Sequence, residues 1–251
     1  MLKDGEVLND LLGYEGLKII QNPEMFNFSL DSTLLGYFAT INKKTQSIVD
    51  LCTGNGPVPL FLSLRSKADI IGVEIQDCSY DLAVRNVAVN HLEDRIKIVQ
   101  GDLKGISKVV GPNRHDLVTC NPPYFKVSDE KNFNKNDFLT IARHEVLATL
   151  DDVVKEAGIL LRHGGRFCMV HRPDRLVEIL TVFQKYKIEP KRMRLVYPRR
   201  TKEANTLLIE GVKGGNKGNL RIDPPLYVYE EGAPRQYSEE ILQIFHQGRE
   251  M

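Results

Sequence analysis

The sequence predicts an α/β fold with a mostly parallel sheet, helices on both faces and an antiparallel hairpin at one edge. From residue 47 onward, short runs rich in β-branched residues alternate with longer segments of helical periodicity, which is the pattern of strand–helix–strand units. The last two long runs, 192–197 and 206–210, have no helical segment between them, as expected of a hairpin. With 251 residues, 42% of them hydrophobic, the chain can bury a large core.

The individual elements alternate along the chain. Each expected strand before the hairpin is a short apolar run, and these runs lie at 47–51, 69–75, 95–100, 116–120 and 165–171. Together with the hairpin they predict a seven-stranded sheet. Apolar residues at three- and four-residue spacing predict the helices, at 57–67, 76–90, 145–161 and 174–185. We expect the third of these helices to stop at the Gly164-Gly165 pair.

The end of the chain is predicted to be less regular. Residues 211–224 are rich in glycine and predict a mobile loop, which a strand at 226–229 and a short helix at 238–246 follow.

The composition excludes several classes of protein. No run approaches the ~18 apolar residues of a membrane span, and the N-terminus lacks the basic and apolar regions of a signal peptide. We therefore expect a cytoplasmic protein with no membrane partner. The cysteines do not have the spacing of zinc ligands or redox pairs, so we expect no metal site and four free thiols, Cys52, Cys78, Cys120 and Cys168.

A glycine-containing turn, DLCTGNG, follows the first expected strand. It runs from Asp50 to Gly56 and opens a helix, the context in which backbone can approach a nucleotide-like ligand closely. Glu74 ends the second strand, 20 residues past Gly54, where a carboxylate can hold two ribose hydroxyls. Asp102 follows the third strand and could accept a hydrogen bond from an adenine amine. Because the carboxyl ends of parallel strands meet at one edge, these groups should converge on one crevice.

Two cofactors compete for this crevice. The nicotinamide dinucleotide fingerprint needs a third glycine where this chain has Pro59, and it directs helix N–H groups at a pyrophosphate. S-adenosylmethionine has no phosphate and carries a cationic sulfonium, so a carboxylate such as Asp50 in the turn is favourable. The sequence favours S-adenosylmethionine; an ordinary turn with ordinary acidic residues is the alternative.

A second motif, Asn121-Pro122-Pro123-Tyr124, follows the fourth strand at the same edge. An exocyclic amine is planar and a poor nucleophile, because its lone pair is delocalised into the ring. Two acceptors, the Asn121 side-chain oxygen and the Pro122 carbonyl, would bind its hydrogens and favour the pyramidal nitrogen that attacks a methyl group. Prolines hold those acceptors rigidly, and Tyr124 offers a face on which a flipped base can stack. A rigid strand exit with a buried tyrosine is the alternative.

The combination of DLCTGNG, IIGVEI, QGDL and CNPPY, with FSLDS at 28–32 ahead of them, resembles the bacterial tRNA valine-1 adenosine-37 N6-methyltransferases. These are Rossmann-like, class I enzymes that depend on S-adenosylmethionine. The resemblance covers roughly residues 14–211. It implies a cofactor-capping segment at 1–46, a methyltransferase domain at 47–211 and a C-terminal loop, strand and helix at 212–251.

The resemblance also implies roles for particular residues. The target nitrogen would lie at Asn121, Pro122, Pro123 and Tyr124. Phe28, Ser29 and Asp31 would close over the cofactor, although Ser29 or Asp31 could instead cap a helix. The cofactor would contact Asp50, Cys52, Thr53, Gly54, Asn55, Gly56, Glu74, Ile75, Asp102, Leu103 and Asn121.

The motif does not fix the substrate, because DNA adenine methyltransferases and release-factor glutamine methyltransferases share NPPY. The release-factor enzymes carry a helical domain ahead of the core, and about 45 residues are too few for one. No target-recognition domain of a DNA enzyme is visible. Residues 185–202 carry eight basic side chains against Glu189 alone, which suits a structured RNA such as tRNA, although a solvated face is the alternative. The expected RNA contacts are Arg172, Arg175, Lys191, Arg192, Arg194, Arg199 and Arg200.

Hypotheses from other classes remain open. The first is a nicotinamide-dependent oxidoreductase, but the third glycine of the dinucleotide-binding fingerprint is missing from this sequence. The second is a non-catalytic RNA-binding module on the same fold, but such a module would not need to keep Asn121, which is present. His144 could act as a base, but a solvated neighbour of a helix cap is the more common role for such a histidine. The oligomeric state stays open, with a monomer favoured.

Overall fold

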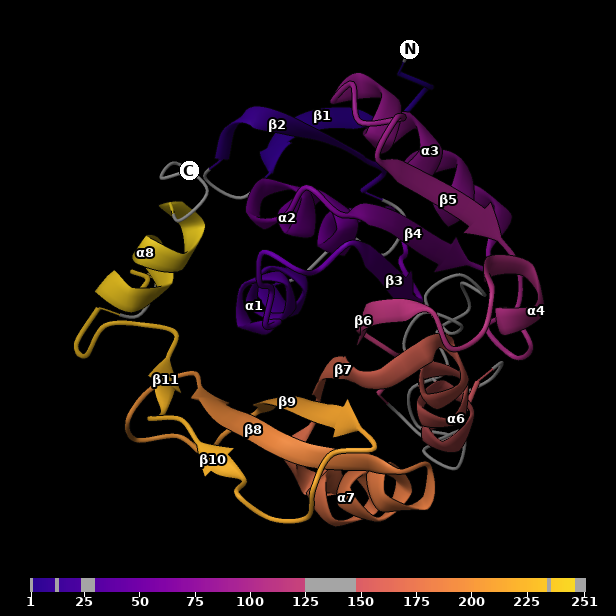
Figure 1. Ribbon diagram of the computed structural model, residues 1–251. Helices are drawn as coiled ribbons and strands as arrows, with labels where there is room; N and C mark the ends of the chain where they lie inside the picture. The colour runs from indigo at the N-terminus through magenta and orange to yellow at the C-terminus, as the bar shows by residue number, and fades with distance from the viewer. Residues whose placement is uncertain (1, 12–13, 24–29, 125–147, 234–235, 247–251) are drawn as a thin grey trace, which may run out of the picture.

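The computed structural model describes residues 2–11, 14–23, 30–124, 148–233 and 236–246. A nine-stranded sheet forms the centre of the molecule, in the order β10-β8-β9-β7-β6-β3-β4-β5 with β11 also paired to β8 (Figure 1). Its strands are β3 (Ser47–Leu51), β4 (Asp69–Glu74), β5 (Ile96–Gln100), β6 (His115–Cys120), β7 (Leu161–His171), β8 (Ile188–Tyr197), β9 (Thr206–Lys213), β10 (Arg221–Ile222) and β11 (Leu226–Tyr227).

The topology confirms the predicted fold class. Strands β3 to β7 pair in parallel, whereas β9 runs antiparallel to both β7 and β8 and forms the predicted hairpin. The seven expected strands are all present, and two strands of two residues each extend the edge at β8. The helices are α1 (Leu30–Phe38), α2 (Pro57–Arg65), α3 (Asp77–Val89), α4 (Ser107–Val110), α6 (Leu150–Leu160), η2 (Pro173–Arg175), α7 (Leu176–Lys185) and α8 (Glu239–His246).

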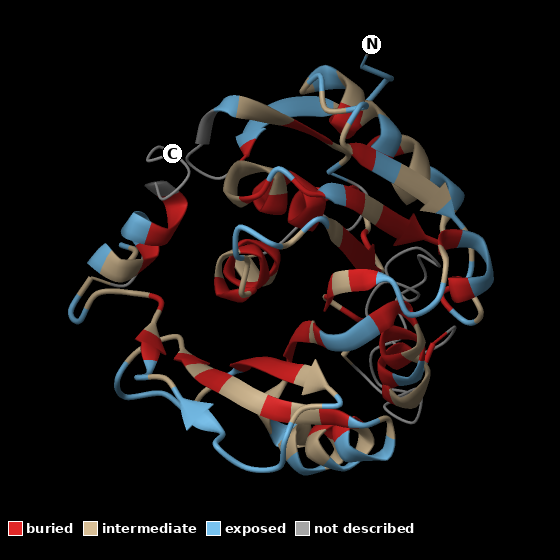
Figure 2. Ribbon diagram, viewed as in Figure 1, coloured by how far each residue is buried: buried red, intermediate tan, exposed pale blue. Residues whose placement is uncertain are grey.

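Two apolar cores lie on opposite faces of the sheet. Neighbouring strand residues alternate between them, because successive side chains of a strand point to opposite faces. Along β7, Phe167 and Met169 pack with α6 and α7, whereas Cys168 and Val170 pack with α1 and α2. Figure 2 shows buried residues along the sheet and on the helices that cover it. The sheet is therefore covered by helices on both faces, as predicted.

An N-terminal hairpin was not predicted. Strands β1 (Val7–Leu11) and β2 (Tyr14–Gln21) pair antiparallel, and β2 lies along α3. The buried Asn86 of α3 holds it, because its amide accepts from the N–H of Ile20 (2.6 Å) and donates to the Ile20 carbonyl (3.1 Å). Asn90, one turn further along α3, makes the same pair of hydrogen bonds with the backbone N–H and carbonyl of Lys18. Residues far apart in sequence therefore fix this hairpin.

The helix predicted at 145–161 has different limits. Within the described residues it begins at Leu150, because the Thr149 side chain accepts from Asp152 N while the Asp152 carboxylate accepts from Thr149 N, a capping box. It ends at Leu160 rather than at the glycine pair, because Leu161 already pairs with His115 as the first residue of β7. Residues 125–147, which contain His144, lie outside the described part of the chain.

The C-terminal segment continues the same structure. The expected loop at 211–224 is ordered at both ends, as β9 extends to Lys213 and β10 occupies Arg221–Ile222. Leu226, Val228 and Ile241 are buried in the core that also contains Leu34 of α1. Among the described residues, no helix has the length and apolar character needed to cross a membrane.

Candidate active site

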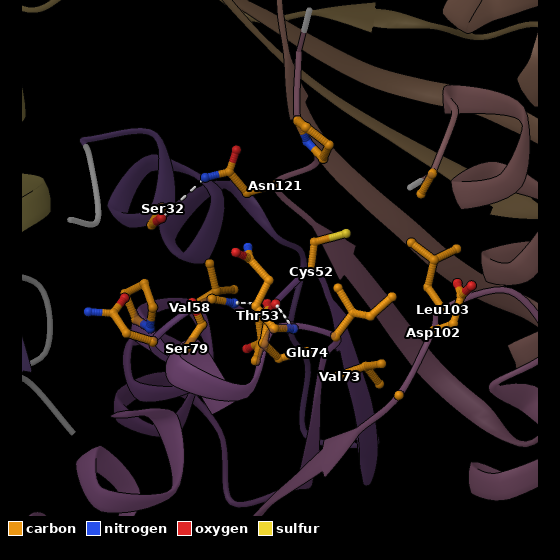
Figure 3. A pocket seen from close by; sticks show the side chains of 18 residues that line it. Ser32, Cys52, Thr53, Val58, Val73, Glu74, Ser79, Asp102, Leu103 and Asn121 are labelled. Atoms are coloured by element: carbon orange, nitrogen blue, oxygen red, sulfur yellow. Dashed lines mark hydrogen bonds between the residues drawn. The ribbon is translucent and has the colours of Figure 1, made fainter. Parts of the chain in front are cut away.

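A pocket opens where β3, β4, β5 and β6 end, the edge at which the sequence places both motifs. It holds about 940 Å3 of space, part of which is open solvent at its mouth. Figure 3 shows Asn121 and Ser32 together on one side, Asp102 and Leu103 on another, and Glu74 between them. Its lining residues are Ser32, Cys52, Thr53, Gly54, Asn55, Pro57, Val58, Val73, Glu74, Ile75, Gln76, Ser79, Gly101, Asp102, Leu103, Asn121, Pro123 and Ala148.

The turn after β3 forms the floor of this pocket. Cys52, Gly54 and Gly56 have positive φ values of 56°, 58° and 89°, so the chain reverses sharply before α2 begins. A side chain at Gly54 would meet nothing within 4 Å, which means that the backbone itself faces the open space. Pro57 starts α2, where a missing N–H costs little. The turn thus exposes backbone to a ligand, as its sequence predicts.

Glu74 ties the turn to the end of β4. One carboxylate oxygen accepts from Gly54 N and the other from Gln76 N, both at 2.8 Å. The side chain is buried, and this burial raises its pKa, while the bonds from Gln76 and Gly54 act in the opposite direction. Each oxygen keeps a second lone pair for a ligand. Glu74 is therefore placed to accept two hydroxyl groups from inside the pocket.

Asp50 does not reach the pocket wall, contrary to the expected cofactor contact. It is 1% exposed and accepts hydrogen bonds from Thr53 Oγ1 (2.7 Å) and Thr119 Oγ1 (2.6 Å). Burial raises the pKa of Asp50 to about 7, and the two threonines lower it only in part. Its carboxyl group therefore joins β3, the turn and β6 from beneath the site.

Asp102 and the apolar residues form the opposite wall. The Asp102 side chain is about 42% exposed and accepts from Lys104 N (2.9 Å). Apolar side chains beside it supply a surface for a flat ring, namely Val73, Ile75, Leu103 and Ala148. The pocket therefore combines a buried carboxylate, an exposed carboxylate and an apolar slot.

Asn121 lies at the rim with both ends of its amide engaged. Its Nδ2 donates to Ser32 Oγ (3.3 Å), and its Oδ1 accepts from the Tyr124 hydroxyl (2.6 Å). Ser32 comes from α1, so the N-terminal segment reaches the wall of the pocket. The two contacts fix the amide orientation, and Oδ1 retains a second lone pair.

Tyr124 does not line the pocket. Its hydroxyl also lies 3.0 Å from Asp31 Oδ2, its ring packs against His171 with centroids 5.3 Å apart, and its carbonyl accepts from Arg175 (3.4 Å). Burial, with a contribution from Asp31, raises the Tyr124 pKa well above its ordinary value, so the hydroxyl keeps its proton. The expected stacking face is therefore turned toward α1 and β7 in this structure.

Other expected site residues have different positions. Gly56 supports α3, since a Cβ there would lie 3.5 Å from Ala83 Cβ. Pro122 is buried, Asp31 contacts Tyr124 rather than the pocket, and Phe28 and Ser29 lie outside the described residues. Eight lining residues were not predicted. A sequence signal existed for Ser32, because it belongs to the FSLDS motif. The other seven are Pro57, Val58, Val73, Gln76, Ser79, Gly101 and Ala148.

The chain is similar in sequence to known tRNA methyltransferases. A family model described as the TRM5/TYW2 methyltransferase domain matches residues 35–125. A tRNA1(Val) (adenine(37)-N6)-methyltransferase of Porphyromonas gingivalis W83 is 30% identical over 207 residues, which are 80% of this chain and 80% of that protein. The chain belongs to the tRNA1(Val) (adenine(37)-N6)-methyltransferase family. The predicted family and the predicted enzyme class are confirmed.

Solved structures show the same fold. A predicted O-methyltransferase from Agrobacterium tumefaciens has a TM-score of 0.69 at 20% identity, with 87% of this chain and 96% of that chain covered. TYW2 from P. horikoshii, in complex with MeSAdo, has a TM-score of 0.60 at 15% identity, with 85% and 73% covered. The methyltransferase family fold thus extends over most of the chain.

The basic residues expected to bind RNA divide into two groups in this family member. Arg194 is 9% exposed and bonded to the Pro224 carbonyl (2.8 Å) and Glu240 (2.6 Å). Arg192 donates to the Phe38 carbonyl and stacks over the Phe38 ring at 3.9 Å. Lys191 bonds the carbonyls of Asn216 and Gly218.

These three side chains hold the C-terminal segment and α1 in place. By contrast, Arg199 and Arg200 lie in the turn between β8 and β9, where the Arg200 side chain is 65% exposed. Arg172 and Arg175 lie after β7, beside the Asn121 motif. Burial contributes most to the low pKa of the neighbouring His171, about 3, so this imidazole is neutral.

Proposed function

We propose that this chain transfers the methyl group of S-adenosylmethionine to N6 of adenine 37 in tRNA1(Val). The observation that carries the proposal is the position of Asn121 Oδ1, fixed by Tyr124 at the rim of a pocket that also contains Glu74. The family supplies the substrate, since its curated members are named for that reaction. The pocket would bind the methyl donor, and the Asn121 motif would bind the amine that accepts the methyl group.

The pocket fits S-adenosylmethionine. Glu74 would hold the two ribose hydroxyls, Asp102 would accept from the adenine amine, and Leu103 and Ala148 would cover the ring. When bound, this cofactor supplies an electrophilic methyl group on a cationic sulfonium. The open space beside the Gly54 backbone leaves room for the amino-acid part of the cofactor. Prolines at the start of α2 remove N–H donors there, which is compatible with this cofactor because it has no phosphate to bind.

Asn121 would prepare the target nitrogen. Its Oδ1 would accept one hydrogen of the exocyclic amine through the lone pair that Tyr124 leaves, and the Pro122 carbonyl would accept the other. This arrangement favours a pyramidal nitrogen with its lone pair available for attack. Ser32 and Tyr124 act as positioning residues, because they fix which end of the Asn121 amide faces the base.

The tRNA would lie over the edge of the sheet that contains the site. Arg172 and Arg175 stand beside the motif, and Arg199 and Arg200 extend from the β8–β9 turn at the same edge, since His171 of β7 pairs with Leu207 of β9. We assign phosphate contacts to Arg172, Arg199 and Arg200, whereas the Arg175 side chain is 10% exposed and paired with Glu178 at 2.7 Å. We also assign a capping role to residues 1–46, because α1 brings Ser32 to the pocket.

Transcripts of tRNA1(Val) test the proposed function directly. The protein is incubated with methyl-labelled S-adenosylmethionine and the transcript, and the RNA is digested to nucleosides. We expect the label in N6-methyladenosine and its loss in a transcript with guanosine at position 37. Label in another nucleoside, equal labelling of the altered transcript, or no labelling of either would overturn the proposal.

A further inference from the structure

Four tyrosines surround the end of β8 and the segment that follows β11. Tyr197 ends β8 and pairs in register with Tyr227 of β11, and their ring centroids lie 5.6 Å apart. Tyr229 and Tyr237 stack nearly parallel, at 5.5 Å and 13°. Backbone bonds from Val228 N to the Tyr197 carbonyl and from Tyr229 N to the Pro198 carbonyl hold the two segments together. The rings are therefore held on a rigid backbone.

Two arginines of the β8–β9 turn lie over these rings. The guanidinium carbon of Arg200 is 4.6 Å from the Tyr227 ring centroid, and that of Arg199 is 6.0 Å from the Tyr229 centroid. Arg200 also pairs with Glu231 at 3.9 Å, but both side chains are mostly exposed, so this ion pair contributes little. The surface thus offers aromatic rings and a planar cation side by side.

Packing of the C-terminal segment against the core accounts for Tyr229 but not for Tyr227. Along 226–229 the residues alternate, with Leu226 and Val228 buried and Tyr227 and Tyr229 partly exposed. The buried pair already anchors the segment in the core with Ile241 of α8. Tyr229 also packs against this core and its partner Tyr237 contacts the buried Phe245, whereas Tyr227 lies beneath the Arg200 guanidinium of the turn.

This surface lies close to the target-nitrogen motif. The hydroxyl oxygen of Thr206, the first residue of β9 after the turn, lies 3.4 Å from Asp31 Oδ1. The other oxygen of Asp31 lies 3.0 Å from the Tyr124 hydroxyl oxygen. Asp31 thus contacts both the motif, at Tyr124, and the strand that directly follows the turn, at Thr206. Figure 1 shows β11 beside the end of β8, on the side of the sheet where α1 lies.

We propose that Tyr197, Tyr227 and Arg200, with Tyr229 beside them, form a stacking platform for an unpaired nucleobase of the RNA that flanks the methylated adenosine. Unpaired bases stack on aromatic rings and on arginine planes in RNA complexes. This inference rests on the proposed function for the identity of the RNA. It adds a base-binding surface outside the pocket, in which the face of the Arg200 guanidinium stacks on the base while its N–H edge keeps the phosphate contact already assigned.

Substitution at Tyr227 tests the platform. Tyr227→Leu keeps apolar bulk but removes the ring, whereas Tyr227→Phe keeps the ring. Each is titrated with the tRNA1(Val) transcript at several salt concentrations. We expect Tyr227→Leu to weaken binding about 5- to 150-fold and Tyr227→Phe to stay within about twofold. Because stacking releases no counterions, the slope of log K against log salt should not change, and cofactor affinity should be that of wild type.

A second variant, at Arg200, keeps the proposal testable if Tyr227→Leu does not fold. Arg200→Lys keeps the charge but loses the planar group, so it should weaken RNA binding without changing the salt slope. Wild-type affinity in a folded Tyr227→Leu protein, or in Arg200→Lys if Tyr227→Leu does not fold, would overturn the platform. Failure of the proposed function is distinguishable, because the wild-type protein would then leave adenosine 37 unmethylated while RNA binding could still depend on Tyr227.

Discussion

The hydroxyl of Tyr124 lies 2.6 Å from the side-chain oxygen of Asn121, and Ser32 of α1 accepts from the nitrogen of the same amide at 3.3 Å. The Asn121 amide is therefore oriented by two elements far apart in sequence, α1 and the motif after β6. One lone pair of the Asn121 oxygen remains for the target amine. Loss of this oxygen should affect the chemical step most.

Asn121→Ala should lower the single-turnover rate by about 100-fold or more. The reason is that the oxygen acts mainly in the transition state, when the amine becomes pyramidal and its hydrogens more acidic. Cofactor affinity, measured by calorimetry, should stay within a few-fold. Asn121→Asp retains an acceptor and should keep part of the activity. A folded Asn121→Ala protein that methylates at the wild-type rate would contradict this role.

Glu74→Ala should weaken binding of S-adenosylmethionine by roughly 10- to 150-fold, since hydrogen bonds to a charged group contribute about 1.5 to 3 kcal/mol. Glu74 also accepts from Gly54 and Gln76, so Glu74→Gln is the matched variant, which keeps an acceptor without the charge. We expect Glu74→Gln to have an intermediate affinity. Unchanged affinity in the alanine variant would remove Glu74 from the cofactor site.

The carboxyl group of Asp50 should make stability depend on pH. Burial raises its pKa in the folded state to about 7, so between about pH 4 and 7 the folded state binds more protons than the unfolded state. The contribution of Asp50 to stability is therefore complete below pH 4 and is lost as the pH rises through 7. Asp50→Asn cannot titrate and serves as the control.

Thermal unfolding of both proteins between pH 5 and 8 measures this effect. One pKa unit corresponds to about 1.4 kcal/mol, and 1 kcal/mol to about 2–4 °C in a chain of this size. The Tm of wild type relative to Asp50→Asn should therefore fall by several degrees over this range. A constant difference between the two proteins would show that Asp50 has an ordinary pKa.

Arg194→Ala should lower stability and leave RNA recognition intact. Its side chain is buried and connects β8 to Pro224 and to Glu240 of α8, so its loss leaves the Pro224 carbonyl without this donor. We expect a loss of about 1–3 kcal/mol in the free energy of unfolding, measured by urea denaturation. The salt slope of tRNA binding should match wild type, whereas Arg199→Ala with Arg200→Ala should flatten it by about one per lost contact. A flattened slope in Arg194→Ala would show that this residue does contact phosphate.

The sheet, the edge at which the motifs meet and the family were all predictable from the sequence. Strands such as β3 and β6 are strongly apolar because helices cover both faces, and that pattern is local and visible. The order of strands also brings Gly54, Glu74 and Asn121 to one edge, since parallel strands all end there. These features depend on nearest neighbours in sequence and on simple rules of topology.

Which polar groups face a ligand depends on contacts between distant segments. Asp50 and Glu74 look alike in sequence, but two threonines from different elements cover Asp50 while Glu74 remains at the pocket. Arg194 and Arg200 lie in one basic run, yet Glu240 and Pro224 enclose the first and not the second. The β1–β2 hairpin was not predicted because four of the five β1 residues are exposed, so β1 has no apolar pattern. The position of β2 depends on hydrogen bonds with α3, which is distant in sequence. Burial and hydrogen-bond partners come from distant segments, so no local pattern contains them.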